Sequence, residues 1–382
     1  MHVKHLSLTD FRNYRSADVE LTRGVTVFVG PNGQGKTNLV ESLSYLSTLA
    51  SHRTSDDRAL LRVGCDMAIV RALLRHGDRE LLVEVQLNRA AANKAQVNRV
   101  AIRTRDLPRY FSSVLFAPED LALVRGEPGV RRRFLDELLV QRTPRLVGVL
   151  ADYERVVKQR NSLLKSARAR GLRVDQLTTL DIWDERLVEL GSEIIDERQA
   201  LLDALAEPVR RGYQAVAGAD HHPTLSLRLS TRGADPEEED GAAVKIGEAA
   251  ASTVDQFRAA LTGARRRELD RGVSLLGPHR DDVLFELNDL PAKGYASHGE
   301  SWSFALALRL GAAELLRAES TTGDPVLLLD DVFAELDSGR RALLAQAVAD
   351  YEQVIITAAV LDDIPPGLGA GLIHIQAGEV VP

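Results

Sequence analysis

The feature that most constrains this chain is an octet, residues 30–37, that reads GPNGQGKT. Before it lies a short β-branched run, residues 24–29, which is typical of a buried strand, and after it leucines recur at helical spacing. Glycines let such a loop wrap closely around phosphate, and the helix that follows adds its positive N-terminal end. The octet therefore predicts a strand–loop–helix unit that binds the phosphates of ATP.

Each position of the octet has an expected task. We expect Lys36 to neutralise charge on the β- and γ-phosphates and the Thr37 hydroxyl to ligate Mg²⁺. The loop itself supplies backbone N–H groups to the phosphates. The predicted nucleotide-binding residues are Gly30, Pro31, Asn32, Gly33, Gln34, Gly35, Lys36 and Thr37.

A magnesium site also needs a carboxylate at the end of a neighbouring strand. The apolar run of residues 326–329 ends in Asp330 and Asp331. We expect Asp330 to belong to the metal shell and Asp331 to act as the carboxylate that activates water. The predicted catalytic residues are therefore Asp331 and Lys36.

A second anion site is predicted far from the octet. Residues 297–300 read SHGE and stand at the head of a largely apolar helical stretch. Ser297, Gly299 and the free N–H groups of the helix start favour a phosphate. One ATP has a single γ-phosphate, so both sites can bind the same phosphate only if they approach it from opposite sides. Two copies of the chain would allow this, because each turn could then close the nucleotide site of the other copy. The alternative is that Ser297 simply caps a core helix.

The length of the chain and the order of its strand-like and helix-like segments predict an α/β protein of two domains. The 382 residues exceed what one hydrophobic core usually supports. Strand-like segments at both ends of the chain flank a mainly helical stretch of about 140 residues. We expect an ATPase head made of residues 1–125 and 272–382, with residues 126–271 inserted as a helical lobe. The run of acidic residues within 235–240 reads as a solvated loop.

Composition favours a cytoplasmic protein without a membrane span. Cys65 is the single cysteine, which suits a reducing compartment. No uncharged apolar run approaches the roughly 18 residues of a spanning helix, and no secretory signal is visible at the N-terminus.

Positive charge is concentrated in one part of an acidic chain. The net charge is −7, yet residues 128–173 hold twelve Arg or Lys against four Asp or Glu. This excess favours a track for nucleic-acid phosphates, although an ordinary solvated helix face is the alternative. The candidates are Arg131, Arg132, Arg133, Lys158, Arg160 and Lys165, with Arg155, Arg168 and Arg170 in the same run and weaker ones at 265–267 and 279–280. Residues 279–282 are equally well read as a salt-bridged loop.

The order of these motifs resembles that of ABC-type P-loop ATPase heads. More narrowly, the chain resembles the RecF family of bacterial recombination mediators, which is related to SMC-type ATPases. The residues that carry this resemblance, besides the octet and the turn at 297–300, are FRNY at 11–14, FAPEDL at 116–121, RRRFLD at 131–136, GPHRDD at 277–282 and LLDDVFAELD at 328–337.

The resemblance implies an ATP-dependent homodimer that acts in recombinational repair and replication-fork maintenance. Such a protein binds DNA at gaps or single-strand/duplex junctions and helps to load RecA together with RecR and RecO. It implies that Arg12 and Asn13 lie near the nucleotide, that Ser297 and Gly299 act in trans, and that residues 335–337 lie at the dimer seam. ATP hydrolysis would be slow, stimulated by DNA and used as a switch.

Three departures from ABC heads affect these expectations. Asp331 stands where such heads commonly carry Glu, and a carboxylate withdrawn by one carbon–carbon bond of about 1.5 Å favours slow hydrolysis. Thr357 stands where a histidine is common, and Trp302 where a basic residue often follows the turn.

Two other classes of protein share parts of this pattern. An ATPase subunit of an ABC transporter would share the phosphate chemistry. A structural SMC-like protein would need two long coiled-coil arms, for which a helical insert broken by prolines at 144, 208 and 223 is too short.

Overall fold

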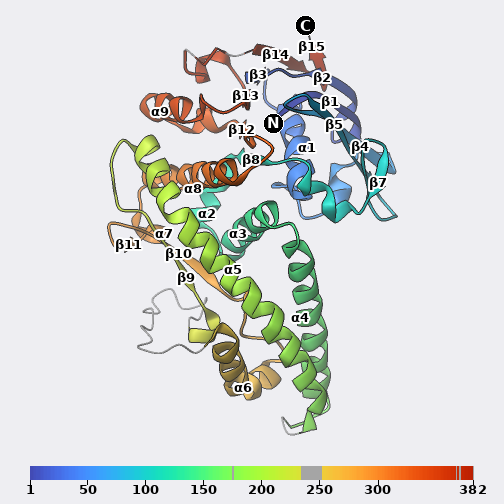
Figure 1. Ribbon diagram of the computed structural model, residues 1–382, viewed down its shortest axis with the longest axis vertical. Helices are drawn as coiled ribbons and strands as arrows, with labels where there is room; N and C mark the ends of the chain where they lie inside the picture. Colours follow the sequence, from blue (N-terminus) through green and yellow to red (C-terminus); the bar gives the residue numbers. More distant parts are fainter. Residues whose placement is uncertain (174–175, 234–251, 367, 370, 382) are drawn as a thin grey trace. The chain divides into compact units, whose positions relative to one another are not determined.

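The computed structural model describes residues 1–173, 176–233, 252–366, 368–369 and 371–381 of the chain (Figure 1). These residues form two compact units. Unit 1 comprises residues 1–125, 207–223 and 295–382, and unit 2 comprises residues 126–206 and 224–294. From the sequence, we expect the second piece of the ATPase head to begin at residue 272. The compact units differ from this expectation, because residues 272–294 belong to unit 2 and residues 207–223 to unit 1. The expected acidic loop at 235–240 lies outside the described residues.

A mainly parallel sheet forms the centre of unit 1, with strand order β15-β14-β3-β13-β12-β8. All neighbours run parallel except the β14–β15 pair. Because the carboxyl ends of parallel strands meet at one edge, the residues that follow β3, β8, β12 and β13 are brought together there. The strands are β3 (Gly24–Val29), β8 (Ser113–Phe116), β12 (Val326–Asp330), β13 (Gln353–Ala358), β14 (Gly371–Gln376) and β15 (Glu379–Val381).

The second sheet of unit 1 is antiparallel, with order β2-β1-β4-β5-β6-β7. In β4 (Met67–His76), buried and more exposed residues alternate, as in a sheet with one face on the core. The other strands are β1 (His2–Phe11), β2 (Tyr14–Glu20), β5 (Arg79–Asn88), β6 (Lys94–Val97) and β7 (Val100–Ile102).

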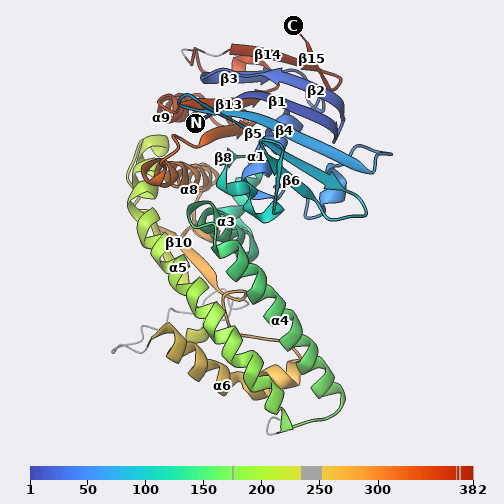
Figure 2. The ribbon, with the colours of Figure 1, turned by 45° about the vertical axis from the view of Figure 1, so that its right-hand side comes forward.

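Helix α1 (Lys36–Thr48) contacts both sheets: strands β8, β12 and β13 of the first, and β4 and β5 of the second (Figure 2). Its residues Leu39, Val40, Leu43 and Leu46 are fully buried in a core that includes strands of both sheets. A helix that buries apolar residues against two layers cannot rotate or slide without opening one of them. The start of α1 is therefore fixed at the carboxyl edge of the parallel sheet.

The remaining helices of unit 1 pack closely. In α8 (His298–Glu319), a Cβ added to Gly311 would lie 2.8 Å from Val209 Cγ2, so α8 and the end of α5 (Thr178–Ala217) meet almost backbone to backbone. The other helices are α2 (Leu121–Arg125) and α9 (Ser338–Val348), with short 3₁₀ turns at Asp57–Leu60, Thr104–Arg109, Pro118–Asp120, Val332–Glu335 and Leu361–Asp363.

Unit 2 is mainly helical, as predicted for this part of the chain. It contains α3 (Pro128–Arg142), α4 (Leu146–Ala169), most of α5 and α6 (Thr253–Arg271), with a 3₁₀ turn at Ser230–Arg232. Its small sheet has the order β11-β10-β9, from Thr224–Arg228 (β9), Asp282–Leu287 (β10) and Leu290–Pro291 (β11). The short α7 (Ala292–Tyr295) lies at the boundary between the units.

The loop at 277–282 is a structural part of unit 2. The Tyr153 hydroxyl lies 2.7 Å from Nδ1 of the half-buried His279, and Ser230 donates a hydrogen bond of 2.7 Å to Asp281. The Asp282 carboxylate accepts bonds of 2.7 and 2.9 Å from Arg131. Of the two interpretations of this loop, the structure therefore matches the salt-bridged one.

Burial changes the protonation of this loop. It lowers the pKa of His279 to about 4 and raises the pKa of Asp281 to about 6. His279 is therefore a neutral ring near neutral pH. Since Nε2 faces the Ser274 carbonyl at 3.4 Å, Nε2 carries the proton and Nδ1 accepts from Tyr153.

Replacing His279 by Gln should make the folded protein less sensitive to acid. The unfolded chain binds a proton on its imidazole near about pH 6.5, whereas the folded chain does so only near the pKa of about 4. Wild type should therefore lose about 2 kcal/mol of unfolding free energy between about pH 7 and about pH 5 that the variant keeps. Urea titrations at both pH values measure this difference. The exposed His76 offers the control, His76→Gln, and pH profiles that run parallel for wild type and His279→Gln would contradict the prediction.

Candidate nucleotide-binding site

The glycine-rich loop joins β3 to α1 at the carboxyl edge of the parallel sheet. Gly33 and Gly35 adopt φ values of 79° and 115°, a region that residues with a Cβ rarely occupy. A Cβ on Gly35 would lie 2.7 Å from Asn13 Nδ2 and 2.8 Å from the Tyr14 hydroxyl. One on Gly30 would lie 2.2 Å from the Ile375 carbonyl oxygen. The glycines are thus required both by the backbone shape and by close neighbours.

Lys36 lies inside this loop. It is 3% exposed, and its Nζ donates hydrogen bonds of 2.8 and 3.1 Å to the carbonyls of Gly30 and Pro31. An ammonium group has three N–H donors, so one remains for a phosphate oxygen. The loop, its glycines and this ammonium fit the phosphates of a nucleotide.

Gln34 is held from two sides, although the sequence predicts it only as part of the loop. Asn13 Nδ2 donates to the Gln34 carbonyl at 3.2 Å. In the turn between β14 and β15, the N–H of Ala377 donates to Gln34 Oε1 at 2.6 Å and that of Gly378 to the Gln34 carbonyl at 3.0 Å. Asn13 therefore contacts the loop that would bind the nucleotide.

Arg12 contacts a buried acid behind the loop. Its Nε and Nη2 donate bonds of 2.8 and 2.6 Å to the two carboxylate oxygens of Glu41, and Nη1 donates to the Ala59 carbonyl at 2.9 Å. Glu41 is fully buried on α1 and also accepts from Ser51 at 2.5 Å. Burial alone would raise the pKa of Glu41, but the bonds from Arg12 and Ser51 outweigh it and the pKa is lowered. Glu41 is not among the site residues predicted from the sequence, although its place as an acid within an apolar helix pattern could have indicated it.

Thr37 and Asp330, the two residues predicted to hold Mg²⁺, lie within hydrogen-bond distance of each other. Thr37 Oγ1 donates to Asp330 Oδ1 at 3.0 Å, across 293 residues of sequence. Thr357 Oγ1 of β13 lies 2.7 Å from the same oxygen, and it accepts from the N–H of Asp331 at 2.8 Å. Thr357 thus makes hydrogen bonds to both Asp330 and Asp331 from the position where related ATPases commonly have a histidine.

Asp330 is buried, and this burial raises its pKa to about 6, with Asp331 and Glu119 adding to the effect. A carboxyl group in this state favours a nearby cation, since charge neutralisation would stabilise its ionised form. Glu119 follows β8, the strand next to β12, and brings a third carboxylate to this edge.

Asp331 has an unusual backbone conformation. Its φ of 51° and ψ of 17° lie in the left-handed region, which Asp and Asn tolerate better than longer side chains do. This conformation offers a physical reason for Asp at a position where related ATPases commonly have Glu.

His52 is the main residue of this edge that the sequence analysis missed. Its Nε2 lies 3.9 Å from Asp330 Oδ2, and both ring nitrogens are buried without a hydrogen-bond partner among the described residues. Burial lowers the pKa of His52. A buried group left unpaired costs about 1–3 kcal/mol, so this arrangement needs an explanation.

The turn at 297–300 is both a helix cap and a surface feature. Ser297 Oγ accepts from the N–H of Glu300 at 3.3 Å, and Glu300 Oε2 accepts from the N–H of Ser297 at 2.8 Å, a capping box at the start of α8. Ser297 and His298 are exposed. Among the described residues, no hydrogen bond or ion pair joins this turn to the loop of residues 30–37.

The guanidinium group of Arg340 lies directly against Gly299. A Cβ at this position would be 2.6 Å from Arg340 Nη2. Arg340 in turn pairs with Asp337 at 2.8 Å, so this arginine links the turn to the predicted seam segment of residues 335–337 within one chain. Trp302, which stands where a basic residue was expected, is 3% exposed and belongs to the core.

Burial corrects the predicted set of DNA-binding residues. Arg160 is fully buried and donates bonds of 2.7 Å to Asp184, 2.5 Å to Glu268 and 2.8 Å to Ser274. Arg131 is 4% exposed and bound to Asp282. The prediction that these two residues contact DNA is wrong, because their guanidinium groups are enclosed by protein partners.

The other candidates differ in exposure. Arg132 is half-buried and donates to the Asp281 carbonyl at 2.7 Å, whereas Arg133 is exposed and pairs with Glu137 at 2.8 Å. Lys158 and Lys165 are exposed on α4, as is Arg155. These three α4 cations are spaced i, i+3 and i+10, so they lie within one side of the helix.

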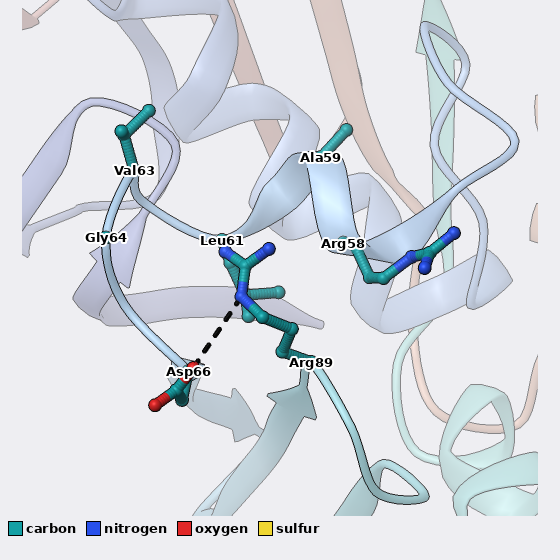
Figure 3. A pocket seen from close by; sticks show the side chains of 7 residues that line it. All are labelled: Arg58, Ala59, Leu61, Val63, Gly64, Asp66 and Arg89. Atoms are coloured by element: carbon teal, nitrogen blue, oxygen red, sulfur yellow. Dashed lines mark ion pairs between the residues drawn. The ribbon is translucent and has the colours of Figure 1, made fainter.

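A hollow of about 530 Å³ lies elsewhere on unit 1 (Figure 3). Arg89 and Asp66, which both line it, form an ion pair of 3.7 Å. It is lined by Arg58, Ala59, Leu61, Val63, Gly64, Asp66 and Arg89, none of which the sequence analysis predicted as a site residue.

The fold and this edge of the sheet define a P-loop ATPase head of the ABC type. Residues 2–362 match the model of the RecF/RecN/SMC N terminal domain family. The chain belongs to this family and, within it, to RecF. The resemblance inferred from the sequence and the predicted fold class are thereby confirmed.

Curated relatives cover the whole chain. A protein of Leifsonia xyli subsp. xyli named DNA replication and repair protein RecF is 66% identical over 382 residues, which are all of this chain and 99% of the relative. A protein of the same name from Streptomyces avermitilis is 50% identical over 384 residues, with 100% and 99% of the two chains covered.

Solved structures give the same result. A structure of the recombination mediator protein RecF with ATP, from the RecFOR pathway, matches with a TM-score of 0.86 and 28% identity, over 100% of this chain and 97% of the other. An Smc head domain of Pyrococcus furiosus shares the fold with a TM-score of 0.53 and 15% identity, over 100% of this chain and 96% of the other.

The alternative of a transporter ATPase subunit is not favoured by these matches. No helix in the described ranges combines the length and the apolar character that crossing a membrane requires.

Replacing Arg12 by Ala should destabilise unit 1 by about 3–5 kcal/mol, because it leaves the Glu41 carboxylate buried without its main partner. Chemical denaturation of the nucleotide-free protein measures this loss. Arg15→Ala removes an exposed arginine nearby and should change little. If Arg12 served only as a nucleotide contact, Arg12→Ala would keep wild-type stability and lose ATP affinity alone.

Proposed function

We propose that this protein is an ATP-dependent, dimerising DNA-binding protein of recombinational repair, in which slow ATP hydrolysis acts as a switch. The observation that carries the proposal is the hydrogen bond between Thr37 and Asp330. It joins the phosphate loop to the acidic strand end in the arrangement that a Mg²⁺–nucleotide site needs.

The nucleotide part of the proposal assigns roles to residues of this edge. The loop amides and Lys36 bind the phosphates, and Thr37 and Asp330 would hold Mg²⁺. Mg²⁺, when bound, would neutralise charge on the β- and γ-phosphates. Solved RecF structures described with ATP, at 28% identity, support ATP as the ligand.

Hydrolysis is assigned to Asp331, which orients the attacking water. The short side chain of Asp331 and its left-handed backbone withdraw the carboxylate from a position that Glu would reach more easily. Because general-base work tolerates little misplacement, turnover should be slow. Thr357 fixes Asp331 through the backbone N–H and so limits any adjustment.

The dimer part rests on the turn at 297–300. The turn is exposed, makes no bond to the phosphate loop of its own chain among the described residues, and offers the N-terminal end of a 22-residue helix. Such an end favours a phosphate. Two copies of the chain would let each turn, with Ser297 and Gly299, close the nucleotide site of the other, so dimerisation depends on ATP by mass action.

The DNA part rests on α4. Arg155 and Lys158 are 70% and 78% exposed, and with Lys165 they follow one side of the helix over about 15 Å. Such a stripe fits a phosphate backbone and reads no base sequence. Gapped DNA or single-strand/duplex junctions are the proposed targets, and RecR, with RecO and RecA, are the proposed partners, in keeping with RecF structures described from the RecFOR pathway.

Lys36→Ala and Ser297→Arg should separate nucleotide binding from dimerisation. Lys36→Ala should lose ATP binding, because the phosphates lose their cationic contact. Ser297→Arg should keep ATP binding in one chain but fail to pair, since bulk and charge enter the closing surface. Sedimentation with and without Mg²⁺–ATP measures pairing, and nucleotide titration measures binding.

A matched control for this pair is Ser320→Arg, which places the same side chain at the far, exposed end of α8. It should dimerise as wild type does. Wild type that stays monomeric at saturating ATP would contradict the dimer, and turnover of tens per second would contradict the switch.

Replacing Arg155, Lys158 and Lys165 together by Ala should weaken DNA binding and its salt dependence. Each lost phosphate contact should reduce the slope of log affinity against log salt by about 0.9, or about 2.7 for all three on duplex DNA. Fluorescence anisotropy with gapped DNA at several salt concentrations measures this slope.

The control for the triple variant is Arg186→Ala with Arg258→Ala. These two cations of unit 2 are also exposed, by 46% and 47%, but each pairs with a glutamate outside the α4 stripe. The control should keep the wild-type slope. An unchanged slope in the triple variant would exclude α4 as the phosphate track.

A further inference from the structure

We propose that His52 is a positioning residue for the metal end of the nucleotide site and acts through the carboxylate of Asp330. The inference rests on the proposed function, because it takes Asp330 as part of the Mg²⁺ shell. No sequence motif points to His52, which lies between the end of α1 and the 3₁₀ turn that begins at Asp57.

The two groups face each other with unused hydrogen-bonding capacity. Asp330 Oδ1 already accepts from Thr37 and Thr357, whereas no described residue donates a hydrogen bond to Oδ2. His52 Nε2 lies 3.9 Å from this oxygen. A movement of about 1 Å would bring the pair to ordinary hydrogen-bond distance.

His52 makes no hydrogen bond through its ring within the described part of the chain, although the carboxylates of Glu119 and Glu41 act on it electrostatically. Its side chain is 13% exposed, and neither Nδ1 nor Nε2 has a hydrogen-bond partner among the described residues. His279 and His221, by contrast, each lie within 2.9 Å of a tyrosine hydroxyl. Buried polar atoms are paired in nearly all proteins, and exceptions point to a functional role or a missing ligand.

The backbone around His52 is held in place by the buried acid of α1. Ser51 Oγ donates to Glu41 at 2.5 Å and accepts from the N–H groups of Arg53 and Thr54 at 3.0 and 3.1 Å. Glu41 is itself fixed by Arg12. The loop therefore presents His52 to Asp330 from a rigid anchor, as a positioning role requires.

His52 approaches the acid from a different element than the histidine of related ATPases. That position, Thr357 on β13, is occupied by a hydroxyl already bound to Asp330 and Asp331. An imidazole from the loop after α1 that donates to Oδ2 would fix the plane of the carboxylate. Groups that orient a metal-binding side chain in this way commonly change metal affinity by about 10–100-fold when removed.

The test is the Mg²⁺ dependence of ATP binding. His52→Ala should raise the Mg²⁺ concentration for half-maximal binding of a fluorescent ATP by about 10–100-fold. ATP binding in EDTA should stay within about twofold of wild type, because the loop and Lys36 are untouched. His52→Gln keeps a donor and should recover part of the loss, and the exposed His76→Ala should match wild type.

The outcomes separate the two proposals. Wild type that fails to bind ATP would contradict the proposed function itself. A folded His52→Ala with a wild-type Mg²⁺ midpoint, or with equal losses in Mg²⁺ and in EDTA, would overturn the positioning role. Thermal melting checks the fold, and if His52→Ala does not fold, the bulkier apolar variant His52→Leu decides by the same titration.

Discussion

Helix α1 lies between the two sheets of unit 1, and its apolar contacts determine where every phosphate-binding group sits. Each fully buried leucine of this helix, such as Leu39, Leu43 or Leu46, stabilises the fold by about 1.5–3 kcal/mol. The helix carries Lys36 and Thr37 in its first turn and Glu41 one turn later. Because α1 cannot shift without opening one of the sheets, the phosphate loop before it is fixed relative to Asp330 on β12.

Buried ion pairs complete this framework at a cost in desolvation. The carboxylate of Glu41 is fully buried, and Arg12 compensates it with two hydrogen bonds. In unit 2, Arg160 joins Asp184 and Glu268 in the same manner. Such pairs add little net stability compared with apolar packing, but removing one partner is costly. They therefore constrain which segments meet. In unit 1 the segment around Arg12 is joined to α1, and in unit 2 helix α4 is joined to α5 and α6.

The sequence predicted the parts of the site that depend on local pattern or on strand direction. The prediction of the phosphate loop depends only on one strand and the helix that follows it. The prediction that Asp330 lies beside this loop depends only on the rule that the carboxyl ends of parallel strands meet at one edge of the sheet. Arg160 was wrongly assigned because charge was counted without helix phase: Val156, Arg160 and Leu164 share the buried side of α4. The role of His52 and the bonds of Thr357 to both acids could not be predicted, since they arise from contacts between segments that no local spacing reveals. Glu41 stands out as an acid within an apolar helix pattern, but its pairing with Arg12 is likewise a contact between segments.

The exposed turn at 297–300 shows why these contacts between segments decide function. Glu300, bound to Ser297 in the capping box, lies 3.6 Å from His221, which in turn contacts Tyr213 near the end of α5. Gly299 lies against Arg340, the partner of Asp337. The turn therefore gains its shape from α5 and α9 as well as from its own cap. A side chain at 299 would displace the guanidinium group of Arg340 and so disturb its ion pair with Asp337, which lies 38 residues further along the chain.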